Sequence, residues 1–174
     1  MKRFGFGRSV AGPLLVPLLV MVLAGCGFQP LMARRDDSRV QEAFAQIKVA
    51  VIADRSGQIL RNYLLDDLNP RGAQGPERYT LRVILSEPRR EVAISRDSTA
   101  NVVAYGASVS FSLSDNRSRM PNFTGNSSSQ STYVVTNSEY ATLSSFNAAR
   151  DRVLQDVSAD IRQQIAAYLL QQSP

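Results

Sequence analysis

A strictly alternating stretch from Val103 to Leu113 constrains the fold of this chain more than any other feature. The odd-numbered positions carry Val, Tyr, Ala, Val, Phe and Leu, whereas the even-numbered positions carry only Ala, Gly and Ser. Successive side chains of a β-strand point to opposite faces of the sheet, so the pattern predicts a strand with one apolar and one hydroxyl-rich face. Further elements must cover the apolar face.

Two amphipathic helices are predicted to provide that cover. The first follows Ser56, which is expected to cap it, and carries Ile59, Leu60, Tyr63, Leu64 and Leu68 at helical spacing. The second begins near Ser138 and spans about 30 residues. Its apolar stripe comprises Tyr140, Leu143, Phe146, Val153, Val157, Ile161, Ile165 and Tyr168.

Three more extended segments complete the predicted sheet. They are 46–52, the stretch 78–95 with a bulge or edge position expected at Pro88, and a weaker strand that ends at Thr136. The order strand, helix, three strands, helix predicts an α+β two-layer sandwich. Its four-stranded, mostly antiparallel sheet would carry both helices on one face.

The N-terminus has the layout of a secretory signal. Basic residues precede an apolar run from Val10 to Leu23, which is too short for a membrane-spanning helix and is interrupted by two prolines. The residues Leu-Ala-Gly-Cys ending at Cys26 resemble the lipobox of bacterial lipoproteins. The alternative is an ordinary signal peptide with an incidental cysteine. We therefore expect a signal peptide over 1–25, a lipidated tether over 26–45 and an α+β domain over 46–174.

The lipobox resemblance implies a location as well as an anchor. It predicts diacylglycerol on the Cys26 thiol and an acyl chain on the new amine, and several chains together make a stable membrane anchor. Gly27 stands where enteric lipoproteins kept at the inner membrane have aspartate. We therefore expect an outer-membrane protein that is lipid-anchored and faces the periplasm.

The composition argues against catalysis. The chain has no histidine, and its one cysteine is assigned to lipid. The general base, metal ligand and nucleophile pairing that these residues usually supply are therefore missing. A hydrolase that uses Asp97 and Asp115 would need carboxylates from turns at opposite ends of one strand. We expect no enzyme activity, no metal and no cofactor beyond the lipid on Cys26.

Basic side chains are the remaining candidates for a binding site. Arg89, Arg90 and Arg96 gather around one predicted turn, whereas Arg117 and Arg119 lie in the next turn at the opposite end of the strands. Either group could clamp anionic head groups or simply solubilise a turn. Lys48, in the first predicted strand, is either a phosphate contact or an outward-facing charge.

Three segments resemble one known family. They are Cys-Gly-Phe-Gln-Pro-Leu from Cys26 to Leu31, Ser-Gly-Gln-Ile-Leu-Arg-Asn-Tyr-Leu from Ser56 to Leu64, and Asp-Ile-Arg-Gln-Gln-Ile-Ala-Ala-Tyr-Leu from Asp160 to Leu169. The chain resembles the lipopolysaccharide-assembly lipoprotein LptE, especially its alphaproteobacterial forms. The resemblance implies a non-enzymatic plug that sits inside the LptD β-barrel translocon, helps it assemble and helps deliver lipopolysaccharide to the outer leaflet.

The resemblance also bears on the binding residues. It implies lipopolysaccharide contact at Arg96, whereas the family's second basic position falls where this chain has Leu143, Ser144 and Ser145. The Ser-rich stretch from Asn122 to Thr132 suits a chain enclosed by a polar barrel. The alternative function is that of an auxiliary lipoprotein of another envelope lipid-transport system. Neither function involves nucleic acid.

Overall fold

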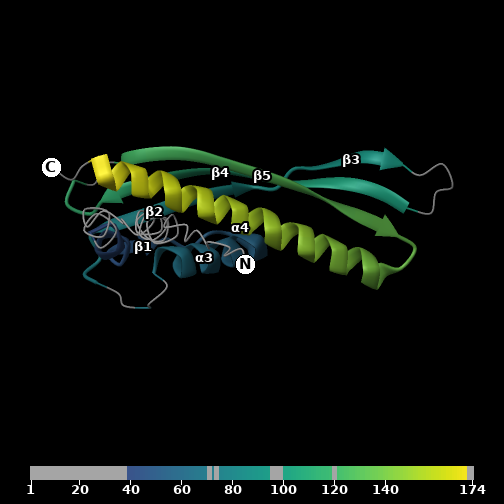
Figure 1. Ribbon diagram of the computed structural model, residues 1–174, viewed down its shortest axis with the longest axis horizontal. Helices are drawn as coiled ribbons and strands as arrows, with labels where there is room; N and C mark the ends of the chain where they lie inside the picture. Colours follow the sequence, from purple (N-terminus) through teal and green to yellow (C-terminus); the bar gives the residue numbers. More distant parts are fainter. Residues whose placement is uncertain (1–38, 70–71, 73–74, 95–99, 119–120, 172–174) are drawn as a thin grey trace, which may run out of the picture. The chain divides into compact units, whose positions relative to one another are not determined.

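A five-stranded sheet and two long helices form the part of the chain that the computed structural model describes, residues 39–69, 72, 75–94, 100–118 and 121–171 (Figure 1). By its contacts, the chain divides into Met1–Arg35 and Asp36–Pro174. The first unit lies outside the described residues, and with it the predicted signal peptide and Cys26.

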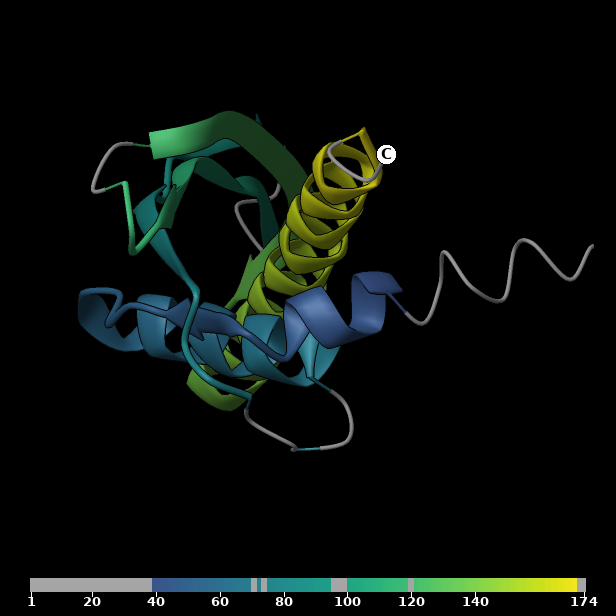
Figure 2. The same ribbon diagram turned by 90° about the vertical axis from the view of Figure 1, so that its left-hand side faces the viewer.

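The elements follow the predicted order, except that four strands instead of three lie between the two helices. They are β1 (Ile47–Val49), α3 (Asp54–Leu68), β2 (Tyr79–Ser86), β3 (Arg89–Ile94), β4 (Ala100–Asp115), β5 (Pro121–Thr136) and α4 (Glu139–Gln171). β4 is central: β5 pairs with one side of it, and β2 and β3 pair with the other. β1 joins β2 in parallel, and every other pair is antiparallel. Both helices lie on one face, around which the sheet curves (Figure 2). The predicted α+β two-layer sandwich is confirmed.

The segment predicted as one strand with a bulge at Pro88 is two strands. β2 pairs with residues 108–115 of β4, and β3 pairs with residues 101–105. Between them, the Gly106 N–H donates to the Pro88 carbonyl at 2.9 Å. Proline has no N–H for the ladder, so regular pairing stops here and resumes at Arg89.

β5 is longer than its sequence predicted. It pairs with β4 from Pro121 to Thr136, although most of its first half is Ser, Thr and Asn. The register places Gly125 opposite Phe111, and a Cβ at Gly125 would lie 2.5 Å from the Phe111 Cζ. The absence of a side chain at this position lets the aromatic ring lie across the strand. The ladder with β4 therefore supports a strand that its own apolar content does not indicate.

The core lies between the sheet and the helices, as the alternation predicted. All odd-numbered residues from Val103 to Leu113 are buried, and Tyr105 and Leu113 are fully buried. All of them except Val103 belong to one cluster with residues of both helices. The helix members of that cluster are Leu60, Leu64, Leu68, Val153, Leu154, Val157, Ile161, Ile165 and Leu169.

Three expectations about the N-terminal part of the domain were wrong. Residues 39–44 are helical and Phe44 is 1% exposed, so the folded domain begins before Gln46, inside the predicted tether. The first strand spans only three residues, and Val51 beyond it is 85% exposed. Ser56 does not cap α3, because the helix begins at Asp54 and Ser56 is buried in its first turn.

The apolar stripe of α4 is covered over only part of its length. Tyr140 is 83% exposed and Leu143 is 56% exposed, whereas every stripe position from Val153 to Ile165 is fully buried. The first turns of α4 extend past α3, together with β3 and the adjoining ends of β4 and β5 (Figure 1). We call this part of the domain the distal end. Among the described residues, no helix combines the length and apolar character needed to cross a membrane.

Candidate functional site

The sheet face opposite the helices is not covered by α3 or α4, and it is rich in polar side chains where β2, β4 and β5 pair. The even-numbered residues of β4 lie on it, and the register places Ser86 and Ser128 on either side of Ser108. Ile84 and Asn126 flank Ser110 in the same way. We call this surface the open polar face. Its members are Ser86, Ser108, Ser110, Ser112, Thr124, Asn126, Ser128, Gln130 and Thr132.

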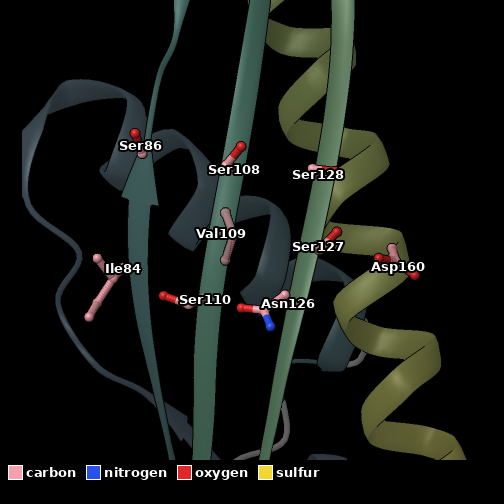
Figure 3. A pocket seen from close by; sticks show the side chains of 9 residues that line it. All are labelled: Ile84, Ser86, Ser108, Val109, Ser110, Asn126, Ser127, Ser128 and Asp160. Atoms are coloured by element: carbon pink, nitrogen blue, oxygen red, sulfur yellow. The ribbon is translucent and has the colours of Figure 1, made fainter.

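A shallow hollow of about 610 Å³ lies on the open polar face (Figure 3). Side chains from β2, β4 and β5 line it, and α4 contributes Asp160 beside β5. A smaller hollow of about 230 Å³ adjoins it and adds Arg82, Ser112 and Thr124. Arg82 adds a positive charge to the face, and Ile84 is an apolar side chain that is 73% exposed. Ser112 and Thr124 are uncharged and add hydroxyl groups.

This arrangement offers hydrogen-bonding groups to a partner. A serine becomes a nucleophile when a positioned base takes its proton, and the chain has no histidine to do so. Asp160, at the margin of the hollow, accepts a hydrogen bond from Gln164 at 3.0 Å. The described residues contain no group of three or more His, Cys, Asp or Glu that could hold a metal ion. Hydroxyl and amide groups offer donors and acceptors in equal measure, which suits a polar partner surface.

Among the described residues, the one ionisable group with a strongly perturbed pKa lies on the other face. Burial raises the pKa of the Tyr105 phenol, and the hydrogen bond to Glu87 and the negative charge of that residue raise it further. Tyr105 donates this bond to the Glu87 carboxylate from within the core. The pair links β4 to the segment between β2 and β3, so we assign it to the fold rather than to a site.

Arg89 and Arg90 lie on opposite faces of β3. Arg89 pairs with Tyr105 and so faces the helices, where its guanidinium lies 4.7 Å from the ring centroid of Phe146 on α4. Arg90 pairs with Ala104 and lies on the side of the open polar face. Arg96, the third predicted member of this group, lies outside the described residues. Adjacent strand residues point to opposite faces, and this separates the first two.

The second arginine group lies far from the first. Arg117 is in the turn after β4, where its backbone N–H donates to Asp115 at 2.8 Å, and Arg119 lies outside the described residues. Ten residues of β4 separate Tyr105 from Asp115, which is about 33 Å of strand. Asp115 also pairs with Arg78 at 3.5 Å, and Asp97 lies outside the described residues.

Two further regions singled out in the sequence have structural partners. Lys48 pairs with Glu77 at 2.9 Å, and both side chains are 55% exposed. In the region of Leu143 to Ser145, the Ser145 hydroxyl donates to the Val134 carbonyl at 2.8 Å, which ties α4 to β5. Sequence reasoning identified hydroxyl groups on single strands. It missed their alignment across β2, β4 and β5, because the alignment depends on strand register.

No protein-family model matches the sequence, and no curated protein matches it. Solved structures do resemble this chain in fold. A Caulobacter crescentus CB15 protein described as a lipoprotein has a TM-score of 0.64 at 22% identity, over 76% of this chain and 96% of its own. A minor lipoprotein from Acinetobacter baumannii has a TM-score of 0.56 at 18% identity, over 72% of this chain and 95% of its own. Rare lipoprotein B from Shewanella oneidensis aligns with a TM-score of only 0.35 at 13% identity, over 72% and 91% of the two chains. The chain thus has a fold that also occurs in proteins described as bacterial lipoproteins.

Proposed function

We propose that this chain is a non-enzymatic outer-membrane lipoprotein of the LptE type. In this proposal, lipid on Cys26 anchors it on the periplasmic side of the membrane. The domain plugs and helps assemble an LptD-like β-barrel translocon, and it helps deliver lipopolysaccharide to the outer leaflet. The resemblance of its sequence segments to LptE and the fold it shares with described lipoproteins support the proposal.

The open polar face is the observation that carries the proposal. A soluble domain of this size usually exposes charged residues, whereas this face has hydroxyl and amide groups in register on three strands. The inside of an outer-membrane barrel is polar, so the hydrogen-bonding groups of such a face would find partners there. Small side chains also allow two sheets to approach closely.

The distal end supports the lipopolysaccharide part of the proposal. Arg90 is exposed there, and the apolar side chains of Val92, Val134, Tyr140 and Leu143 are between 41% and 83% exposed. Cationic and apolar groups at one end of the domain would suit an anionic lipid, which has both phosphates and acyl chains. The predicted contact residue Arg96 follows β3, which forms part of this end.

Co-purification from outer membranes tests the proposal. Tagged full-length protein is expected to bring down a large β-barrel that mass spectrometry identifies as an LptD homologue. Failure to recover that barrel under conditions that preserve outer-membrane complexes would refute the proposal.

Depletion separates the proposal from its alternative, an auxiliary lipoprotein of another envelope lipid-transport system. We expect lipopolysaccharide to accumulate at the inner membrane after depletion, while phospholipid distribution changes only later. Normal lipopolysaccharide export with an early phospholipid defect would favour the alternative.

A further inference from the structure

A buried guanidinium nitrogen without a partner lies far from the open polar face. The Arg61 Nε is buried and makes no hydrogen bond. Arg61 lies on α3, one turn before Leu65, and both residues line a hollow of about 120 Å³ beside β1. Leaving a buried charged donor unsatisfied is costly, so such groups in native proteins usually meet a water or an ion.

No hydrogen bond joins the Arg61 Nε to the groups that line this hollow. Among the described residues that line it, Glu77 is the only carboxylate, and both oxygens of that group accept from the Lys48 ammonium, at 3.0 and 2.9 Å. The backbone carbonyl of Ala45 accepts from the Gly75 N–H, and that of Gln46 accepts from the N–H groups of Arg78 and Tyr79. The three charged residues of the lining therefore sum to one excess positive charge, which is located at Arg61.

We propose that the hollow binds a phosphate group, with Arg61 as its main contact and Lys48 as its second. A guanidinium offers two parallel N–H donors to a phosphate, and an ammonium adds a point charge. A phosphate has enough oxygens to accept from both side chains at once. The volume is well above the about 10–15 Å³ that one water needs, so an ion of several atoms has room.

The phosphate has two possible sources, a lipid head group or free phosphate. The hollow lies beside residues 45–49, and only 12 residues, 27–38, separate Cys26 from the first described residue. Fully extended, they span at most about 40 Å, so a membrane phosphate is within reach. This source rests on the proposed anchor at Cys26, whereas binding of free phosphate does not depend on the proposed function.

Thermal unfolding of the full lipidated protein in a neutral detergent tests the site. At constant ionic strength, inorganic phosphate should raise the Tm of the wild type, because a ligand that binds the folded state stabilises it. Arg61→Gln should weaken phosphate binding by about tenfold or more, since charged hydrogen bonds are lost. Glu77→Gln should strengthen binding several-fold, because it releases Lys48.

Arg162→Gln is the matched control. The Arg162 Nε is also buried without a hydrogen bond, but its guanidinium lies 5.7 Å from the Phe44 ring centroid and does not line the hollow. This variant should keep the wild-type response to phosphate. No Tm shift in the wild type, an equal shift in Arg61→Gln, or an equal loss in both arginine variants would overturn the proposal.

Repeating the titration in membranes identifies the source. If a lipid head group fills the hollow, reconstitution into phosphatidylglycerol vesicles should abolish the shift that phosphate causes in detergent. If the shift persists unchanged in those vesicles, the hollow binds free phosphate. Neither experiment involves a β-barrel, so their failure would leave the proposed function standing.

Discussion

At the residue scale, neighbouring residues of similar type have different surroundings. Arg89 and Arg90 are indistinguishable by composition, yet the strand alternation sends one onto Phe146 and the other toward the open polar face. The alternation is visible in the sequence of β4. The break in pairing at Pro88 determines which residues of β3 lie opposite which residues of β4. The site role of each arginine therefore could not be predicted from its position in a basic cluster.

These two arginines make a matched pair of variants. Arg89→Ala should lower the free energy of unfolding by about 0.5–1 kcal/mol, because it removes the cation–π contacts with Phe146 and Tyr105. Arg90→Ala should change it by less than about 0.5 kcal/mol, as exposed substitutions usually do. Urea unfolding followed by circular dichroism measures both. Equal losses would contradict the different surroundings described for them.

Arg96→Glu tests the residue that the LptE resemblance implies in lipopolysaccharide binding. We expect weaker lipopolysaccharide binding with an unchanged unfolding midpoint, since a position in a predicted turn should tolerate the change. Arg152→Glu, an exposed change of the same charge on α4, is the control and should leave binding unaltered. Unchanged binding of Arg96→Glu would assign this arginine to a solubilising role.

The raised pKa of Tyr105 predicts that the domain loses stability at alkaline pH. Its pKa is raised above the usual value of about 10, so the folded state holds the phenolic proton more tightly than the unfolded state. The resulting stabilisation is complete below about pH 10 and is lost as the pH rises above that value. The wild type should therefore lose stability between about pH 9 and pH 11.5 more steeply than Tyr105→Phe.

Urea midpoints across this pH range provide the measurement. Tyr140→Phe is the control, because Tyr140 is 83% exposed and its removal should leave the wild-type slope intact. Identical slopes for the wild type and Tyr105→Phe would show that the raised pKa of Tyr105 does not contribute.

At the element scale, the hydrophobic periodicity of the sequence located both helices and most strands. It failed where the structure of a segment depends on the elements beside it. The stripe of α4 continues smoothly through Tyr140 and Leu143, but α3 does not extend far enough to cover them. β5 looked weak because its first half is mostly Ser, Thr and Asn, yet β4 supplies a full ladder of partners. Helix coverage and strand pairing are properties of two elements, so one segment's pattern could not reveal them.

The packing of α3 on the segment after β1 depends on Gly57. A Cβ at this position would lie 2.7 Å from the Ile52 Cγ2 and 3.1 Å from the Ile52 carbonyl carbon. Gly57→Ala should therefore destabilise the domain by about 1–3 kcal/mol, even though alanine is the better helix former. Gln58→Ala, exposed in the same helix, should have little effect. A stabilised Gly57→Ala variant in thermal unfolding would contradict this close approach.

At the scale of the whole domain, the two faces of the sheet differ in composition and surroundings. The helix-covered face holds the core, and the open polar face presents hydroxyl and amide groups in register. The sequence was sufficient to predict the sandwich and a hydroxyl-rich face on β4. The extension of that face over β2 and β5 required the register, and the hollow at Arg61 required the packing of α3 beside β1.

A photo-crosslinking amino acid at Ser128 tests most directly the central claim that the open polar face lies against a β-barrel. Ser128 is exposed on that face, whereas Gln163 is exposed on α4 and serves as the control position. In living cells, irradiation should crosslink position 128 to an LptD homologue, identified by mass spectrometry, far more strongly than position 163. Absence of a barrel adduct at position 128, or an equal yield at both positions, would contradict the account.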